Sequence, residues 1–143
     1  MKTLSTTTYF IDSDIPVFGH EVPTFPSGVG EAFEEIVQWL PGGFDRPFFG
    51  ISRMDGQRMI YVAGALEKFP GEGKPKFPQI LAIEKGHYAV SELIGWKENV
   101  ASIKDVFVGM VENIPNADLA KPCVEWYFDD DKMWCMIKLK EGV

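Results

Sequence analysis

The sequence predicts an α+β fold in which duplicated β-α-β-β units form one antiparallel sheet with two helices on one face. Two segments have apolar residues at helical spacing, and most of the remaining chain consists of short strand-like segments between turns. The order strand, helix, loop, proline, strand, tight turn, strand occurs twice, in residues 15–66 and again in residues 80–140. The repetition predicts two similar halves that complete one sheet.

We assign residues 1–143 to a single domain, because this length is usual for one domain and 45% of the residues are hydrophobic. A connector, residues 67–79, separates the halves, and its glycines and prolines leave little room for regular structure. Residues 1–14 are polar and rich in threonine. We therefore expect them to contribute no residue to a functional site.

Each predicted helix has one apolar face. The apolar residues of the first helix are Val29, Phe33, Ile36, Val37 and Leu40, and those of the second are Val100, Ile103, Phe107, Met110 and Ile114. Ser27 is a candidate N-cap for the first helix, and Pro41 and Pro115 end the two helices. A single apolar face indicates that each helix lies on a flat surface, here the sheet, rather than inside a bundle.

Seven segments have the aromatic and β-branched composition of strands and are bounded by turn residues. They are residues 15–22, 48–54, 59–66, 80–83, 88–94, 123–128 and 133–139. The last two form a hairpin, and pairing Phe128 with Met133 around a four-residue turn fixes which side chains share a face.

With that pairing, strand alternation divides the second hairpin into two faces. The helix-covered face carries Val124, Trp126, Phe128, Met133, Cys135, Ile137 and Leu139. The helix-free face carries Glu125, Tyr127, Trp134, Met136 and Lys138. One carboxylate therefore lies among two aromatic rings and a methionine, where a merely solvated strand would carry polar residues.

The first hairpin offers a matching hollow. A two-residue turn at residues 55–56 places Gly50 opposite Tyr61, with Ala63 on the same face. Gly50 is the equivalent of Glu125 when the prolines that precede the two hairpins are aligned. Small residues here leave a hollow with Tyr61 as one wall, and the alternative is ordinary aromatic cover over a strand glycine.

A carboxylate among aromatic and thioether side chains suits a lipophilic cation. Aromatic faces attract positive charge, by about 0.5–2 kcal/mol for each ring, and methionine adapts to flat, irregular ligands. The alternative is an exposed cross-strand ion pair between Glu125 and Lys138, which would contribute little to stability. The candidate ligand-binding residues are Glu125, Tyr127, Trp134, Tyr61, Trp96 and Met136.

Other kinds of site have weaker support. Asp129, Asp130 and Asp131 have no further ligands in the sequence and are typical of a solvated turn, so we expect no metal site. Cys123 and Cys135 match no metal-ligand spacing and do not face each other, which favours free thiols in a reduced, cytoplasmic protein. We find no phosphate-binding glycine loop or catalytic triad, and we expect neither a cofactor nor catalytic residues.

Composition and charge limit the classes of partner that the protein can bind. The net charge is −7 and no basic stripe is present, so direct nucleic-acid binding is not expected. No apolar run is long enough for a membrane span, and the first residues lack the apolar core of a signal peptide.

Two motifs resemble a known family, the GyrI-like effector-binding domains. Residues 83–90 (Ile-Glu-Lys-Gly-His-Tyr-Ala-Val), followed by Gly95, are similar to the family's Gly-x-Tyr-Ala-Val strand before its second helix. Residues 122–127 (Pro-Cys-Val-Glu-Trp-Tyr) are similar to its Pro-x-x-Glu-x-Tyr strand. The motifs lie within residues 78–140, whereas the likeness of residues 15–66 rests on the duplicated architecture.

The resemblance implies a ligand pocket on the sheet, with Glu125 at the position of the family's buried acid that meets cationic drugs. We therefore expect a stand-alone binding protein for lipophilic cations. Regulators of the family join this domain to a DNA-binding helix-turn-helix, for which the residues before Ile15 are too few. A homodimer or a separate regulator protein would then be the partner.

Two alternatives stay open. Some relatives implied by the resemblance are hydrolases that open strained rings of alkylating compounds, and Glu125 and Tyr127 lie on one strand face as a possible acid–base pair. Others inhibit gyrase through protein–protein contacts. We favour binding over catalysis, because His20 and His87 lie far apart in the sequence and no Ser-His-Asp arrangement is visible.

Overall fold

The computed structural model describes residues 6–141. Its helical elements are α1 (Val29–Trp39), the 3-10 turn η1 (Trp96–Glu98) and α2 (Val100–Asn113). Its strands are β1 (Thr7–Ile11), β2 (Ile15–Glu21), β3 (Phe48–Asp55), β4 (Arg58–Leu66), β5 (Gln79–Ile83), β6 (Gly86–Ile94), β7 (Cys123–Tyr127) and β8 (Lys132–Lys138).

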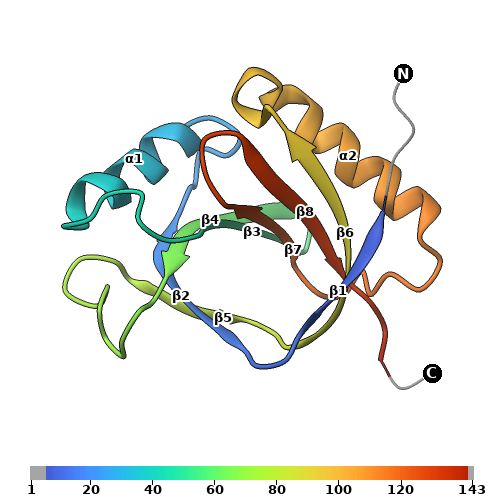
Figure 1. The fold of residues 1–143 in the computed structure, drawn as a ribbon, viewed down its shortest axis with the longest axis horizontal. Coiled ribbons are helices and arrows are strands. Elements are labelled where there is room, and N and C mark those ends of the chain that lie inside the picture. Colours follow the sequence, from blue (N-terminus) through green and yellow to red (C-terminus); the bar gives the residue numbers. More distant parts are fainter. Residues whose placement is uncertain (1–5, 142–143) are drawn as a thin grey trace.

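The eight strands form one curled sheet in the order β1-β6-β8-β7-β3-β4-β2-β5, and every neighbouring pair is antiparallel. Both helices lie on the same side of this sheet, and the strands β1, β2 and β5 curl away from them (Figure 1). The predicted α+β fold with two helices on one face of an antiparallel sheet is confirmed. The open curl makes the sheet a half-barrel.

The strand order is symmetric about the β7–β3 pair, so each half is a β-β-α-β-β unit, and β1 is the one strand that the seven predicted segments lack. The first strand of each unit crosses to the other unit: β1 pairs with β6, and β5 pairs with β2. The strand β1 was missed because Thr7 and Thr8 look like a polar leader. Residues 1–5 of that segment lie outside the described part of the chain.

Buried residues pack on both faces of the sheet, and on the helix side a smaller cluster around Tyr61 and Ala63 lies beside the main core. The helix-side core includes Ile36, Phe48, Met110, Tyr127, Met133 and Cys135. The helix-free face encloses a second core inside the curl, which includes Ile11, Phe49, Tyr88, Val90, Val124 and Met136. Burial on both faces explains the apolar composition of the central strands.

The start of α1 differs from the prediction. Gly28, in the left-handed conformation with φ 89°, precedes the helix, and no side chain caps it, so Ser27 is not the N-cap. The predicted C-terminal ends of both helices are confirmed, because α1 ends two residues before Pro41 and α2 ends two residues before Pro115.

The register of the second hairpin corrects the predicted faces. Tyr127 pairs with Met133, and Glu125 pairs with Cys135, one residue away from the predicted pairing. The cause lies in the turn, where the Asp129 carboxylate accepts the backbone N–H groups of Asp131 and Lys132, at 2.8 and 2.7 Å. A one-residue shift exchanges the faces of one strand relative to the other.

As a result, Glu125 and Tyr127 belong to the helix-covered face rather than the helix-free face, and the β7 residues Val124 and Trp126 belong to the helix-free one. The β8 assignments of Met133, Cys135, Ile137 and Leu139 to the helix side are confirmed.

The first hairpin is also shifted, but by two residues. Asp55 pairs with Arg58, and Ser52 rather than Gly50 pairs with Tyr61. The turn therefore lies at Gly56, which has φ 66°, and at the residue after it. An even shift preserves the faces, so Gly50 and Tyr61 still share one.

Candidate functional site

Glu125 lies at the centre of a polar cluster on the helix side of the sheet. The hydroxyl of Tyr61, on β4, donates a hydrogen bond of 2.6 Å to Glu125 Oε1, and the hydroxyl of Tyr127 donates one of 2.8 Å to the same oxygen. Both tyrosines are buried, while Glu125 is half-buried. Charge-assisted hydrogen bonds of this length hold the carboxylate in one orientation.

A glycine leaves room for this cluster. Gly50 on β3 is the direct register partner of Glu125, and both positions face the helix side of the sheet. A Cβ atom at Gly50 would collide with the Tyr61 hydroxyl and with Glu125 Oε1. The hollow expected above Gly50 is therefore the space in which Tyr61 meets Glu125.

Aromatic rings from both halves surround the two tyrosines. Phe25, in the loop before α1, stacks on Tyr61 with ring centroids 4.6 Å apart and planes 9° apart. Phe33, on α1, and Trp96, on η1, meet Tyr127 edge-on at 5.6 and 4.7 Å. We call Glu125, Tyr61 and Tyr127 with Phe25, Phe33 and Trp96 the Glu125 site.

The β7–β8 turn positions Trp96. Its indole N–H donates a 2.9 Å hydrogen bond to the carbonyl of Asp129, and the Gly95 N–H donates one of 2.7 Å to the carbonyl of Asp131. Lys97 forms an exposed ion pair with Asp130 at 3.1 Å. The acidic turn thus anchors the segment before α2, and the predicted solvated loop has this structural role.

The carboxylate has no cationic partner within residues 6–141, because none of the ion pairs there includes Glu125. Burial raises the pKa of Glu125 above the ordinary glutamate range, and the two tyrosine hydrogen bonds offset part of that rise. Burial and the neighbouring carboxylate also raise the pKa of both tyrosines, so their hydroxyls stay protonated donors.

One oxygen of the carboxylate remains free. Both tyrosine bonds go to Oε1, and Glu125 Oε2 accepts no hydrogen bond from the described residues. Glu125 is half-buried, so its side chain is not fully enclosed. The site thus presents an unneutralised, partly accessible acid among aromatic rings.

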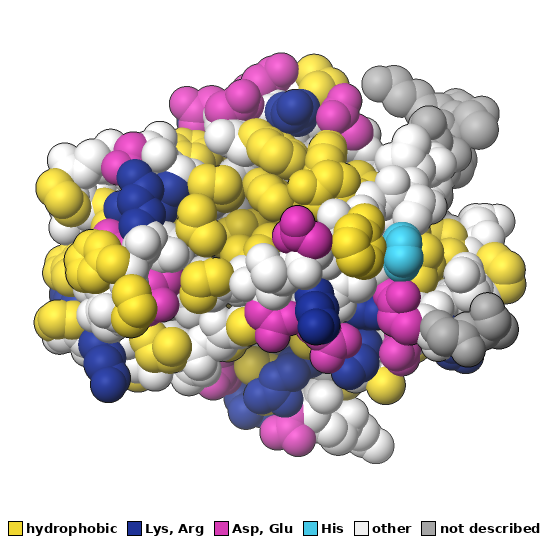
Figure 2. Space-filling view, turned by 60° about the horizontal axis from the view of Figure 1, so that its bottom comes forward, with side chains coloured by type: hydrophobic (Ala, Val, Ile, Leu, Met, Phe, Trp, Pro, Cys, Tyr) yellow, Lys and Arg dark blue, Asp and Glu magenta, His cyan; other side chains and the backbone are white. Residues whose placement is uncertain are grey.

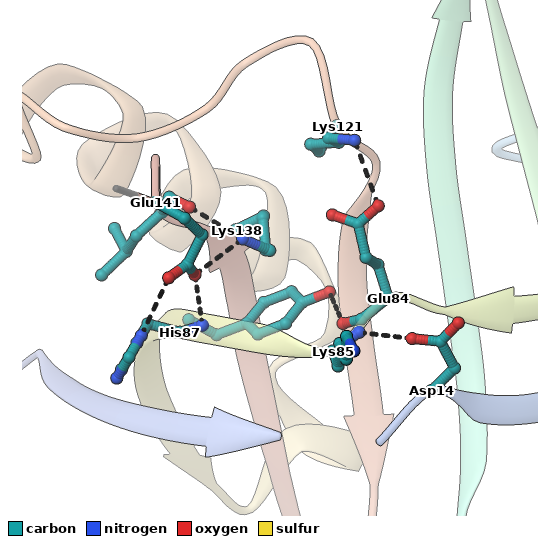
Figure 3. Close-up of polar contacts among 9 residues, drawn as sticks. Asp14, Glu84, Lys85, His87, Lys121, Lys138 and Glu141 are labelled. Carbon is teal, nitrogen blue, oxygen red and sulfur yellow. Dashed lines mark hydrogen bonds and ion pairs between the residues drawn. The ribbon is translucent and has the colours of Figure 1, made fainter. Parts of the chain in front are cut away.

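The alternative ion pair between Glu125 and Lys138 does not form. Lys138 is buried on the other side of the sheet, where its Nζ donates to Glu141 at 2.8 Å and to the carbonyl of Leu139 at 2.9 Å. Figure 3 shows Glu141 joining Lys138 to His87, whose backbone N–H and ring Nδ1 contact the same carboxylate. These bonds hold the pKa of Glu141 down at about 2.

Of the six predicted ligand-binding residues, the structure brings four together: Glu125, Tyr127, Tyr61 and Trp96. It places Trp134 and Met136 on the helix-free face, with Trp134 among Tyr9, Trp126 and Phe128 and with Met136 in the second core. The one-residue register shift separates these two residues from Glu125, because it puts Glu125 and Tyr127 on the helix side.

Sequence reasoning missed Phe25 and Phe33. Phe33 was assigned to the apolar stripe of a core helix, and Phe25 lies between two prolines in a loop. The duplication carried a signal for Phe25, because it precedes α1 as Trp96 precedes α2.

Within the described residues, no group of three or more potential ligands could hold a metal ion, and Cys123 and Cys135 are free thiols. Among those residues no helix has the length and apolar character needed to cross a membrane.

Solved structures of distant sequence share this fold. An integron cassette protein from the mobile metagenome of Vibrio cholerae matches with a TM-score of 0.67 and 13% identity, over 94% of this chain and 95% of that one. SAV2435, solved bound to tetraphenylphosphonium, matches with a TM-score of 0.62 and 13% identity, over 96% and 94%. That neighbour holds a lipophilic cation.

A protein from Staphylococcus aureus MU50, assigned provisionally to bacterial transcription regulation, matches with a TM-score of 0.58 and 12% identity, over 95% of this chain and 98% of that one. These likenesses establish the fold, and it is consistent with the GyrI-like resemblance. No family model and no curated protein sequence matches the chain.

Proposed function

We propose that the protein is a GyrI-like binding protein for lipophilic organic cations, with Glu125 as the residue that recognises the charge. The observation that carries the proposal is the carboxylate itself, which has two tyrosine donors on one oxygen and no cationic partner within residues 6–141. An ionised carboxylate in this half-buried place is costly without a counter-ion, and a ligand cation would supply one.

The rings of the Glu125 site supply the second half of the recognition. Phe25, Phe33 and Trp96 are all half-buried, so part of each ring remains available to a ligand. Aromatic faces bind a delocalised cation by cation–π attraction and by burying its apolar surface. The neighbour solved with tetraphenylphosphonium supports a ligand of this class.

The partner is part of the proposal. A second copy of this chain or a separate regulator protein is the partner through which a bound effector would act. The net charge of −7 argues against direct contact with nucleic acid.

The test is a calorimetric titration of the purified protein, first with tetraphenylphosphonium and then, in a separate experiment, with neutral triphenylphosphine oxide. We expect the cation to bind about tenfold or more tightly than the neutral compound. Mass spectrometry of the recovered ligand should show it unchanged. Equal affinities would contradict cation recognition, and turnover of a strained-ring alkylating compound would favour the hydrolase alternative instead.

A further inference from the structure

Nearly every polar side-chain atom of the Glu125 site already has a hydrogen-bond partner. The hydroxyls of Tyr61 and Tyr127 both donate to Glu125 Oε1, at 2.6 and 2.8 Å. The indole N–H of Trp96 donates to the carbonyl of Asp129 at 2.9 Å. The two phenylalanines of the site have no polar side-chain atom. Within residues 6–141, Glu125 Oε2 is therefore the one side-chain acceptor of this site that has no hydrogen bond.

Burial closes the two tyrosine oxygens to a ligand. Tyr61 is 1% exposed and Tyr127 is 7% exposed. The other members of the site are half-buried, namely Glu125, Phe25, Phe33 and Trp96. A ligand that enters from solvent therefore meets one free carboxylate oxygen surrounded by aromatic carbon.

The number of N–H groups on a ligand cation decides how well it can use a single acceptor. A protonated tertiary amine has one N–H, which can form one charge-assisted hydrogen bond to a carboxylate. A quaternary ammonium ion has none and contributes its charge alone. A primary ammonium ion has three, and the N–H groups that turn toward aromatic rings lose their water partners without gaining an acceptor.

We propose that the Glu125 site selects protonated tertiary amines over primary and quaternary ammonium ions that have the same aromatic body. The single N–H of the ligand donates to Glu125 Oε2, and its apolar body contacts Phe25, Phe33 and Trp96. The inference rests on the proposed function, because it requires that Glu125 meets the charge of the ligand. It adds the kind of cation that the site accepts best.

The test compares four compounds that share one body, in calorimetric titrations of the full chain at neutral pH. They are 2,2-diphenylethylammonium, its protonated N,N-dimethyl derivative, its N,N,N-trimethylammonium derivative and the neutral 2,2-diphenylethanol. We expect the tertiary ammonium ion to bind about tenfold more tightly than the primary one and about threefold more tightly than the quaternary one. The quaternary ion is the stricter comparison, because its additional methyl group brings more apolar surface to bury.

Binding at the Glu125 site has to be separated from adsorption elsewhere. Viewed from the side of β1, β2 and β5, the molecule carries a patch of hydrophobic side chains bordered by acidic and basic ones, which offers an amphiphilic amine a second place to adsorb (Figure 2). In ¹H–¹⁵N spectra, each cation should shift the amides around Tyr61, Trp96 and Glu125 saturably. Shifts confined to β1, β2 and β5 would place the binding on that patch and overturn the proposal.

Tyr127→Phe tests the acceptor count within the site. Removal of this hydroxyl frees one acceptor position on Glu125 Oε1, so the ratio of tertiary to primary affinity should fall about threefold. The ratio is measured within one protein, so a changed pKa of Glu125 affects both cations alike. Tyr88→Phe, which removes a buried hydroxyl bonded to the Glu84 carbonyl, is the matched control and should leave the ratio unchanged.

The titrations distinguish failure of this inference from failure of the proposed function. If the three cations bind equally well and all more tightly than the alcohol, the preference is overturned while cation recognition by Glu125 stands. Tightest binding of the primary or the quaternary ion, or an unchanged ratio in Tyr127→Phe, would likewise overturn the preference. If no cation binds more tightly than the alcohol, the inference and the proposed function both fail.

Discussion

Gly50 and Glu125 lie directly opposite each other on the central strands β3 and β7. They are also equivalent positions of the two halves, which places the carboxylate on the boundary between the repeats. One half supplies the acid, and the other supplies a residue with no side chain, so the tyrosine of β4 can reach across to the acid of β7. The site is therefore a product of asymmetry within a duplicated fold.

Gly50→Ala should damage the site directly. The added methyl group overlaps the Tyr61 hydroxyl and Glu125 Oε1, so one of them has to move. We expect a loss of about 1–3 kcal/mol in the free energy of unfolding and weaker cation binding, measured by denaturation and calorimetry. Gly30→Ala is the matched control, because its Cβ meets nothing within 4 Å in α1 and should stabilise slightly. Equal effects of the two changes would contradict the packing account.

Tyr61→Phe and Tyr127→Phe should each raise the pKa of Glu125 further, because each removes a hydrogen bond that favours the ionised carboxylate. We expect each change to cost about 1.5–3 kcal/mol of stability at neutral pH, as for a hydrogen bond to a charged group. The two losses should not add, since both hydroxyls bond one oxygen. Tyr88→Phe, which removes a buried hydroxyl bonded to the Glu84 carbonyl, is the control.

Cation binding should strengthen as the pH rises. The free site holds a proton on Glu125 to a higher pH than an ordinary glutamate does, because its pKa is raised, and a bound cation favours the ionised form. Affinity should therefore fall about tenfold per pH unit below the pKa of the free site, with release of one proton on binding. Calorimetry in buffers of different ionisation enthalpy measures that proton.

The same pKa shift has a consequence for the unliganded fold. When the pKa of a group is higher in the folded protein than in the unfolded chain, its protonated form stabilises the fold. This contribution is complete at pH values below the pKa in the unfolded chain, and it is lost as the pH rises through the pKa in the folded protein. Glu125→Gln should remove this pH dependence and stabilise the free protein by about 0.5–2 kcal/mol at neutral pH. The difference in the free energy of unfolding between the two proteins should therefore change with pH. A difference that stays constant across the pH range would contradict a raised pKa for Glu125.

Trp96 should report ligand binding, and Trp134 should not. Trp96 contacts Tyr127 in the Glu125 site, whereas Trp134 lies on the helix-free face with its indole N–H bonded to Glu92. Quenching of tryptophan fluorescence by a bound cationic dye should therefore shrink in Trp96→Phe and persist in Trp134→Phe. The reverse result would return the site to the helix-free face that the sequence predicts.

The sequence predicted the fold well because its two strongest signals are local. The helical stripes, and the prolines that stop the helices and precede the hairpins, repeat in both halves. The strand β1 escaped because Thr7 and Thr8 have no apolar partner along the chain, and only pairing with β6 makes the segment a strand. Such a contact between residues about eighty positions apart leaves no periodicity to detect.

The site was predicted in its chemistry and misplaced in its geometry. Glu125, Tyr127 and Tyr61 were identified, but the hairpin closes on Phe128 and Lys132 around three residues instead of the predicted four, in a turn held by the Asp129 carboxylate. That single side-chain interaction puts Glu125 and Tyr127 on the helix side and leaves Trp134 and Met136 on the helix-free face. The length of a turn depends on hydrogen bonds that the amino-acid composition does not reveal. A single carboxylate between aromatic residues, in contrast, can be recognised in the sequence.

The central claim, that Glu125 recognises a ligand cation, is tested most directly by the affinities of Glu125→Gln for tetraphenylphosphonium and triphenylphosphine oxide. The change keeps the shape of the side chain and removes its charge. We predict that the variant loses about 2–5 kcal/mol of binding free energy for the cation, as for a buried ion pair that loses one partner. Its affinity for the neutral compound should stay within about 0.5 kcal/mol of the unsubstituted protein. Equal losses for both ligands, or no loss for either, would contradict the claim.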